Sequence, residues 1–210
     1  MDRSRIALVI PALNEAVSIS AVVRGASRFG KCLVVDDGSV DDTAHAALAS
    51  GALVISHKVN RGYDAALSSG FAEADRLDYE AVITLDADGQ HNPELLADFI
   101  AALESGAHVV LGVRDRKPRL AEHVFAWSTR RFGVADPLCG MKAYRMEVYR
   151  ALGHFDAYRS IGAELALYAA RNGYRLASVP IKVRARTGHP RFGRALSANL
   201  KIFRALLLSL

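Results

Sequence analysis

The chain has 210 residues, of which 51% are hydrophobic and 23% are charged. This composition is typical of a globular protein and excludes a disordered or collagen-like chain. The two cysteines, Cys32 and Cys139, are far apart in the sequence and form no CxxC motif, which argues against a disulfide scaffold or a cysteine-rich zinc site. One domain in a reducing compartment is therefore expected.

Charge is distributed unevenly along the chain, although the net charge is only +5. Residues 1–111 contain eight basic and sixteen acidic residues, whereas residues 112–210 contain nineteen basic and six acidic residues. The acidic half could hold a metal ion and the basic half could meet an anionic partner, although single charges more often lie on solvated faces. The sequence shows no recognised nucleic-acid-binding motif, so no nucleic-acid partner is expected.

The sequence predicts no membrane-spanning or secreted segment. The first apolar run is too short for a signal peptide, and no stretch reaches the roughly 20 apolar residues of a membrane span. We expect a cytoplasmic location, either free or peripheral on the inner face of the membrane. Residues 193–210 have the pattern of a basic amphipathic helix, which could lie on a lipid surface or cover the core.

Short apolar runs alternate with helix-like segments from the N-terminus onward. The expected strands are 6–10, 32–35, 52–55, 81–85 and 108–111, and the expected helices are 44–48, 65–74 and 95–103. Further along, helices are expected at 121–132 and 161–170, and a strand at 176–183. Nearly continuous Val, Ile and Leu runs are typical of parallel strands that are buried on both faces. The pattern predicts an α/β fold with an open, mostly parallel sheet flanked by helices.

Each of the first five apolar runs ends in a polar or glycine-containing cluster: PALNE, DDGSVDD, HKVNRG, DADGQH and GVRDR. In open α/β sheets, ligands bind at the carboxyl ends of the strands. Five such clusters at one sheet edge indicate a binding site.

DADGQH is the sharpest of these clusters. Asp86 and Asp88 stand one residue apart after a strand, and Gln90 follows. Hard divalent cations prefer carboxylate and amide oxygens, and two carboxylates this close repel each other without a cation. A helix start explains Asn92 and Pro93 but leaves the Asp pair unexplained.

Three other clusters carry weaker signals. Asp36 and Asp37 could bind the donor groups of a base or ribose, while Ser39 and Asp42 have capping-box spacing. Pro11 would end a strand, and Glu15 could accept a bond from a hydroxyl group or simply belong to a helix start. Arg61 and the backbone at Gly62 could meet a phosphate, or form an ordinary turn.

In this order, IPALNE, VVDDGSVDDT, HKVNRG, DADGQH and DPLCGMKAYR resemble the motifs of family 2 glycosyltransferases. The pattern is most similar to the dolichyl-phosphate mannose synthase group, which acts on polyprenyl phosphates, and it covers approximately residues 5–193. The resemblance implies a GT-A fold and a donor that is a UDP- or GDP-linked sugar.

The resemblance also implies roles for particular residues. Asp86, Asp88 and Gln90 would hold magnesium or manganese, with Asp88 also in the catalytic set. Arg114, Arg186 and Arg191 would contact donor or acceptor phosphates, and the two latter arginines would also belong to the catalytic set. The nucleotide-binding set would be Pro11, Ala12, Glu15, Asp36, Asp37, Arg61, Gly62, Asp86 and Ala87. Residues 1–111 would form the nucleotide-sugar and metal half, and 112–192 the acceptor half.

The acceptor is less constrained than the donor. A polyprenyl phosphate is already ionised and needs no strong base, whereas a hydroxyl acceptor needs one. Asp136 is then the candidate, although it could equally be a turn residue before Pro137. Cys139 stands where the family usually has Ser, and a packed small residue is expected there rather than a nucleophile. Two rival interpretations are an aspartyl-nucleophile phosphohydrolase and a nucleotide-sugar-binding module without catalysis.

Overall fold

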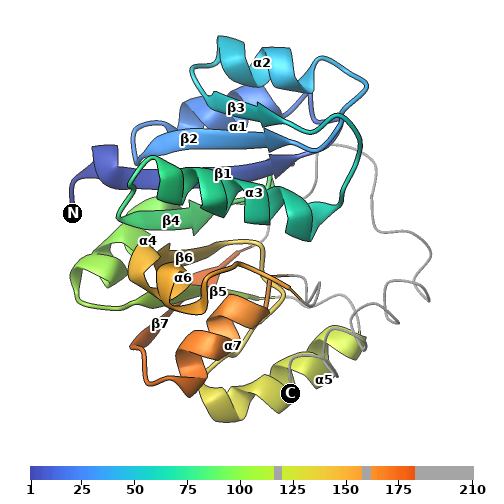
Figure 1. The fold of residues 1–210 in the computed structure, drawn as a ribbon. Helices are drawn as coiled ribbons and strands as arrows, with labels where there is room; N and C mark the ends of the chain where they lie inside the picture. Colours follow the sequence, from blue (N-terminus) through green and yellow to red (C-terminus); the bar gives the residue numbers. More distant parts are fainter. Residues whose placement is uncertain (116–119, 158–161, 183–210) are drawn as a thin grey trace.

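The computed structural model describes residues 1–115, 120–157 and 162–182 and contains one seven-stranded sheet of order β3-β2-β1-β4-β6-β5-β7 (Figure 1). β6 runs antiparallel to both of its neighbours, and every other pair is parallel. This confirms the predicted α/β sheet. The strands are β1 (Ile6–Ala12), β2 (Lys31–Asp36), β3 (Leu53–Ser56), β4 (Ala81–Thr84), β5 (Val109–Arg114), β6 (Lys142–Arg145) and β7 (Leu176–Ile181).

Helices cover both faces of the sheet, because alternate strand residues point to opposite sides. Ile6, Leu8 and Ile10 of β1 pack in one core with α1, α2 and α4, whereas Ala7 and Val9 pack in the other with α3, α5, α6 and α7. The helices are α1 (Ile19–Ala26), α2 (Thr43–Ala49), α3 (Tyr63–Arg76), α4 (Leu95–Glu104), α5 (Leu120–Thr129), α6 (Met146–Leu152) and α7 (Glu164–Arg171), with short 3₁₀ turns η1 (Arg3–Arg5) and η2 (Arg130–Phe132).

The elements expected between residues 6 and 182 are present with shifted ends, but sequence reasoning missed α1, β6 and α6. β6 has only four residues, Lys142–Arg145, and a charged residue at each end, so it shows no apolar run. The predicted helix at 121–132 is divided into α5 and η2, and the predicted helix at 161–170 begins at Glu164.

The reversed direction of β6 decides what lies at the carboxyl edge of the sheet. Thr84 at the end of β4 pairs with Lys142 at the start of β6, and Leu111 of β5 pairs with the same residue. The segment that precedes β6, residues 136–141, therefore lies at the same edge as the DADGQH cluster.

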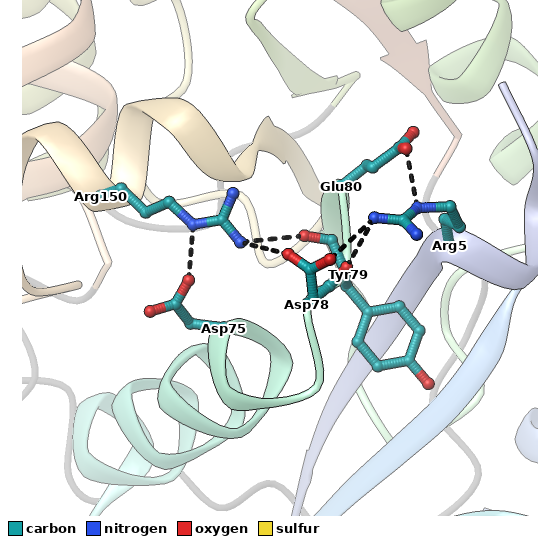
Figure 2. Close-up of polar contacts among 6 residues, drawn as sticks. All are labelled: Arg5, Asp75, Asp78, Tyr79, Glu80 and Arg150. Atoms are coloured by element: carbon teal, nitrogen blue, oxygen red, sulfur yellow. Dashed lines mark hydrogen bonds and ion pairs between the residues drawn. The ribbon is translucent and has the colours of Figure 1, made fainter.

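The opposite edge of the sheet carries a surface network of ion pairs (Figure 2). Arg5 pairs with Asp78 (3.1 Å) and Glu80 (2.7 Å), and Arg150 pairs with Asp75 (2.6 Å) and, more distantly, Asp78. This network joins the end of α3 and the residues before β4 to the start of β1 and to α6. Because these side chains are substantially exposed, the network adds little to stability.

No helix in the described part of the chain is long and apolar enough to cross a membrane. The predicted amphipathic helix at 193–210 lies outside the described residues.

Candidate functional site

The loops after β1 and β2 are fastened to each other by side chains. The Asn14 amide N–H donates to Ser39 Oγ (2.8 Å), and the Val40 N–H donates to Asn14 Oδ1 (2.9 Å). The capping box expected from Ser39 and Asp42 is wrong, because Asp42 precedes α2 without a side-chain cap and Ser39 serves Asn14 instead.

The predicted nucleoside-pocket residues of these two strands lie side by side. Ala12, at the end of β1, accepts a hydrogen bond from the Asp37 N–H (2.8 Å) and is in register with Asp36. The Asp36 carboxylate is 6% exposed and accepts from the Ser39 N–H (3.2 Å). Glu15 is 8% exposed and accepts from Ser18 Oγ (2.8 Å). Together with Pro11 in β1, they form one continuous stretch of the sheet edge.

The Asp37 side chain holds the loop that follows β3. Its carboxylate accepts from the N–H groups of Arg61 (2.9 Å) and Gly62 (2.7 Å) and lies 2.7 Å from His57 Nδ1, whose other ring nitrogen contacts Ser69. Gly62 has φ +97°, a conformation that glycine adopts at little cost. These contacts favour a role for Asp37 and Gly62 in shaping the loop over direct contact with a nucleotide, and they leave the Arg61 side chain exposed.

Asp86 lies where three elements meet. Tyr63, the first residue of α3, donates its hydroxyl to Asp86 Oδ1 (3.2 Å). His91 Nδ1 lies 3.8 Å from Asp86 Oδ2. Gly140, just before β6, is so close that a Cβ on it would lie 2.3 Å from Asp86 Oδ2. The DADGQH cluster and the DPLCG segment are therefore in direct contact.

The chemistry of this corner fits a divalent cation. Asp88 is 8% exposed, and its Oδ1 accepts from the Gln90 N–H (3.0 Å), which orients it beside Asp86. His91 is 6% exposed, and its Nδ1 has no hydrogen-bond partner among the residues that the structure describes. A small rotation of the Asp86 side chain would bring its carboxylate within hydrogen-bonding distance of His91. Carboxylates that bind metal ions are commonly hydrogen-bonded in this way.

Within residues 1–115, 120–157 and 162–182, no three His, Cys, Asp or Glu side chains gather closely enough to hold a metal ion. A cation held by Asp86 and Asp88 would therefore take further ligands from elsewhere, as Mg²⁺ commonly does from phosphates and water.

Arg114 and Asp136 form a buried ion pair beside this corner. Asp136 is 1% exposed and accepts three hydrogen bonds of 2.8–3.1 Å from Arg114, which also contacts Glu122 of α5 (2.9 Å). Burial alone would lower the pKa of Arg114, but the hydrogen bonds and charge of Asp136 raise it above its ordinary value. The Asp136 backbone carbonyl also accepts the Cys139 N–H (3.3 Å), so Asp136 is the turn residue considered above as well as half of the ion pair. This geometry favours a structural role over that of a general base.

Cys139 is packed rather than poised for reaction. It is 1% exposed and lies so close to Gly112 that a Cβ there would be 2.8 Å from its Sγ. Burial raises the pKa of the Cys139 thiol to about 12, so the thiolate that acts as a nucleophile is scarce at neutral pH.

A buried polar cluster lies behind the site. Lys142 Nζ donates to Gly162 O (2.8 Å), and the Gly162 N–H donates to Asp156 Oδ2 (2.8 Å). Burial lowers the pKa of Lys142. Burial and, next, the charge of Asp156 raise the pKa of Asp64 to about 6. Asp64 follows Tyr63 in the first turn of α3, so this cluster supports the helix that contacts Asp86.

The raised pKa of Asp64 predicts a pH-dependent stability. The folded protein binds this proton more tightly than the unfolded chain, whose carboxyl titrates near 3.8. The stability contribution is complete below that value and is lost as pH rises through about 6, amounting to at most about 3 kcal/mol at about 1.4 kcal/mol per pKa unit. In urea unfolding between pH 4 and 7, Asp64→Asn should gain stability relative to the wild type as pH rises. Asp98→Asn, at an exposed position of α4, is the control. Parallel curves for Asp64→Asn and wild type would contradict the prediction.

Sequence reasoning missed several of these residues. Tyr63, His91 and Gly140 contact Asp86 through the fold, and Glu122 contacts Arg114. For His91, its position directly after DADGQ in the sequence could have indicated a place in the site. Arg186 and Arg191 lie outside the described residues.

Residues 7–153 match the family model described as glycosyl transferase family 2. The chain belongs to glycosyltransferase family 2. Dolichyl-phosphate hexose transferase of Haloferax volcanii is 32% identical to this glycosyltransferase, with 87% of this chain and 84% of the relative covered. Polyprenol monophosphomannose synthase of Mycolicibacterium smegmatis is 31% identical, with 84% and 76% covered.

Among solved structures, the family 2 glycosyltransferase is similar to glucosyl-3-phosphoglycerate synthase of Mycobacterium tuberculosis, crystallised with Mn²⁺ and UDP-glucose. The TM-score is 0.79 at 28% identity, with 99% of this chain and 79% of that chain covered. This likeness and the family match confirm the GT-A fold and the assignment as a glycosyltransferase over the phosphohydrolase interpretation.

Proposed function

We propose that this glycosyltransferase transfers a hexose, with inversion, from a nucleoside-diphosphate sugar to a polyprenyl phosphate. The observation that carries the donor half is the corner at the end of β4, where Asp86 meets Tyr63, His91 and Gly140 and the buried Asp88 follows two residues later. The nucleoside would lie along the adjoining edge of β1 and β2, beside Glu15 and Asp36. The glucosyl-3-phosphoglycerate synthase structure with Mn²⁺ and UDP-glucose supports the same class of donor here.

In this proposal Asp86 and Asp88, with Gln90, hold Mg²⁺ or Mn²⁺ on the diphosphate. A bound divalent cation stabilises the charge that develops on the departing nucleoside diphosphate. Tyr63 and His91 would orient the Asp86 carboxylate, and the Arg61 side chain would approach the phosphates. Arg186 and Arg191 remain proposed as further phosphate contacts.

The buried pair of Arg114 and Asp136 supports a phosphate acceptor. A hydroxyl acceptor needs a base that can reach it, but the Asp136 carboxylate is buried and accepts three bonds from Arg114. A phosphate acceptor is already ionised at neutral pH and attacks without losing a proton to the enzyme. The relatives named for dolichyl-phosphate and polyprenol-phosphate products support the same choice, and with it a peripheral place at the membrane.

The donor is tested by thermal unfolding of the full chain with UDP, GDP and their sugars, each with and without Mn²⁺. Binding at a hundredfold excess over Kd stabilises the folded state by about 2.7 kcal/mol. We expect a Mn²⁺-dependent rise in Tm with one nucleotide base and none with ADP or pyrophosphate. The absence of a rise with every nucleotide would contradict the donor proposal and favour a chain that has lost catalysis.

The acceptor is tested by sugar transfer in detergent to a polyprenyl phosphate and to the matching polyprenol. We expect product only from the phosphate, with the anomeric configuration opposite to that of the donor. Transfer to a free hydroxyl alone would overturn the acceptor proposal while leaving the donor site intact.

A further inference from the structure

Helix α5 has two different faces. Glu122, Phe125 and Thr129 point into the protein and are 3% exposed or less. Trp127, on the other side, is 78% exposed. A tryptophan side chain buries a large apolar area when it finds a partner, so a surface that leaves it in water is a candidate for contact with another body.

Exposed arginines follow the tryptophan directly. Arg130 and Arg131 of η2 are both exposed, and the Arg131 guanidinium lies 4.7 Å from the centre of the Phe132 ring. The Arg171 guanidinium of α7 lies 5.0 Å from the same ring. We name Trp127, Arg130 and Arg131 the α5 surface.

The α5 surface has one sign of charge. Glu122 is the only acidic residue in the sequence between 120 and 135, and its carboxylate is buried against Arg114. In the described part of the chain no carboxylate pairs with Arg130 or Arg131. An exposed indole beside two such guanidinium groups matches an anionic bilayer, where tryptophan lies at the headgroup level and arginine meets phosphate. We propose that the α5 surface is a docking surface for an anionic lipid bilayer.

The position of α5 connects this surface to the site. Glu122 on the inner face of α5 contacts Arg114, and Arg114 contacts Asp136 at the carboxyl edge of the sheet. The α5 surface is thus on the outer side of the same helix that borders the acceptor half of the site. The proposal deepens the proposed function, because a lipid-linked phosphate must be reached at a bilayer, but vesicle binding is measured without donor or acceptor.

Trp127 provides its own probe, since it is the only tryptophan in the chain. The full chain is mixed with vesicles of phosphatidylcholine alone or with 30% phosphatidylglycerol, and tryptophan emission is recorded. We expect a blue shift with the anionic vesicles, quenching by brominated lipid, and loss of both effects at high salt. The salt effect follows from screening of the arginine charges.

Charge variants make the test specific to the surface. Arg130→Ala with Arg131→Ala should weaken partitioning into anionic vesicles by about 30-fold, at about fivefold for each arginine. Arg24→Ala with Lys31→Ala removes two exposed positive charges elsewhere and should have little effect. Trp127→Ser, followed by vesicle sedimentation, should also weaken binding.

Three results would overturn the proposal. Vesicle binding without any change in Trp127 emission would place the lipid contact on another surface. A blue shift that grows with protein concentration in the absence of lipid would show a second copy of the chain on the surface. No vesicle binding, with transfer to polyprenyl phosphate retained in detergent, would overturn the surface but not the proposed function.

Discussion

Replacing Gly140 with alanine is expected to weaken Mn²⁺ binding, and the nucleotide binding that depends on it, by about 10- to 100-fold, the range for groups that orient metal ligands. A Cβ at this position would lie 2.3 Å from Asp86 Oδ2 and 2.7 Å from Oδ1. Gly140 is not among the residues with positive φ, so alanine fits the backbone. Thr84 Oγ donates to Gly140 O (2.7 Å) and holds the loop, so the carboxylate is the group that must move.

The measurement is a Mn²⁺ titration followed by free-ion EPR, with nucleotide-dependent Tm as a second readout. Asp86→Ala removes the group that the new methyl would meet. In the Asp86→Ala background, Gly140→Ala should lower the free energy of unfolding little further, because the two changes affect one shared contact. Unchanged Mn²⁺ affinity of Gly140→Ala would contradict the assignment of Asp86 as a metal ligand oriented by this contact.

Replacing Asp136 with alanine is expected to lower the free energy of unfolding by about 3–5 kcal/mol, the usual cost of removing one partner of a buried pair. Among the described residues, Glu122 would then be the one carboxylate left in an ion pair with the charged Arg114. For a chain of this length the Tm should fall by about 10 °C, at about 2–4 °C per kcal/mol. Urea unfolding and a thermal scan measure both quantities.

A paired change separates stability from chemistry. Arg114→Met with Asp136→Leu replaces both charges with apolar side chains and should recover most of the lost stability. A general base predicts the opposite pattern, in which Asp136→Ala folds as stably as wild type and loses turnover alone. Stability that is unaffected by Asp136→Ala would therefore restore the general-base interpretation and weaken the argument for a phosphate acceptor.

The strands of the first half were predictable because their signal is local. Runs such as 6–10 and 81–85 are apolar on both faces, as parallel strands between two layers of helices must be. The same logic placed the polar clusters at one edge, since the carboxyl ends of parallel strands meet there. Asp86 and Asp88 stood out because two carboxylates one residue apart at a strand end need an explanation beyond a helix start.

The partners of these residues were not predictable, because they arise from contacts distant in sequence. Gly140 meets Asp86 only because the short strand β6 runs backwards between β4 and β5. Asp136 accepts from Arg114 across 22 residues, so a carboxylate that reads as a base or a turn becomes half of an ion pair. Asp37 reads as a ligand-binding residue, yet its hydrogen bonds are directed to the backbone of the following loop.

The reversed direction of β6 has a consequence for how such enzymes can diversify. Because β5 ends and β6 begins at the same edge, the two ends of the connection between them lie close together, where Arg114 and Asp136 form their ion pair. Because the ends of the connection are held together, its length can change without shifting the register of any strand. A change in this connection would therefore leave the carboxyl ends of β1, β2 and β4 in place.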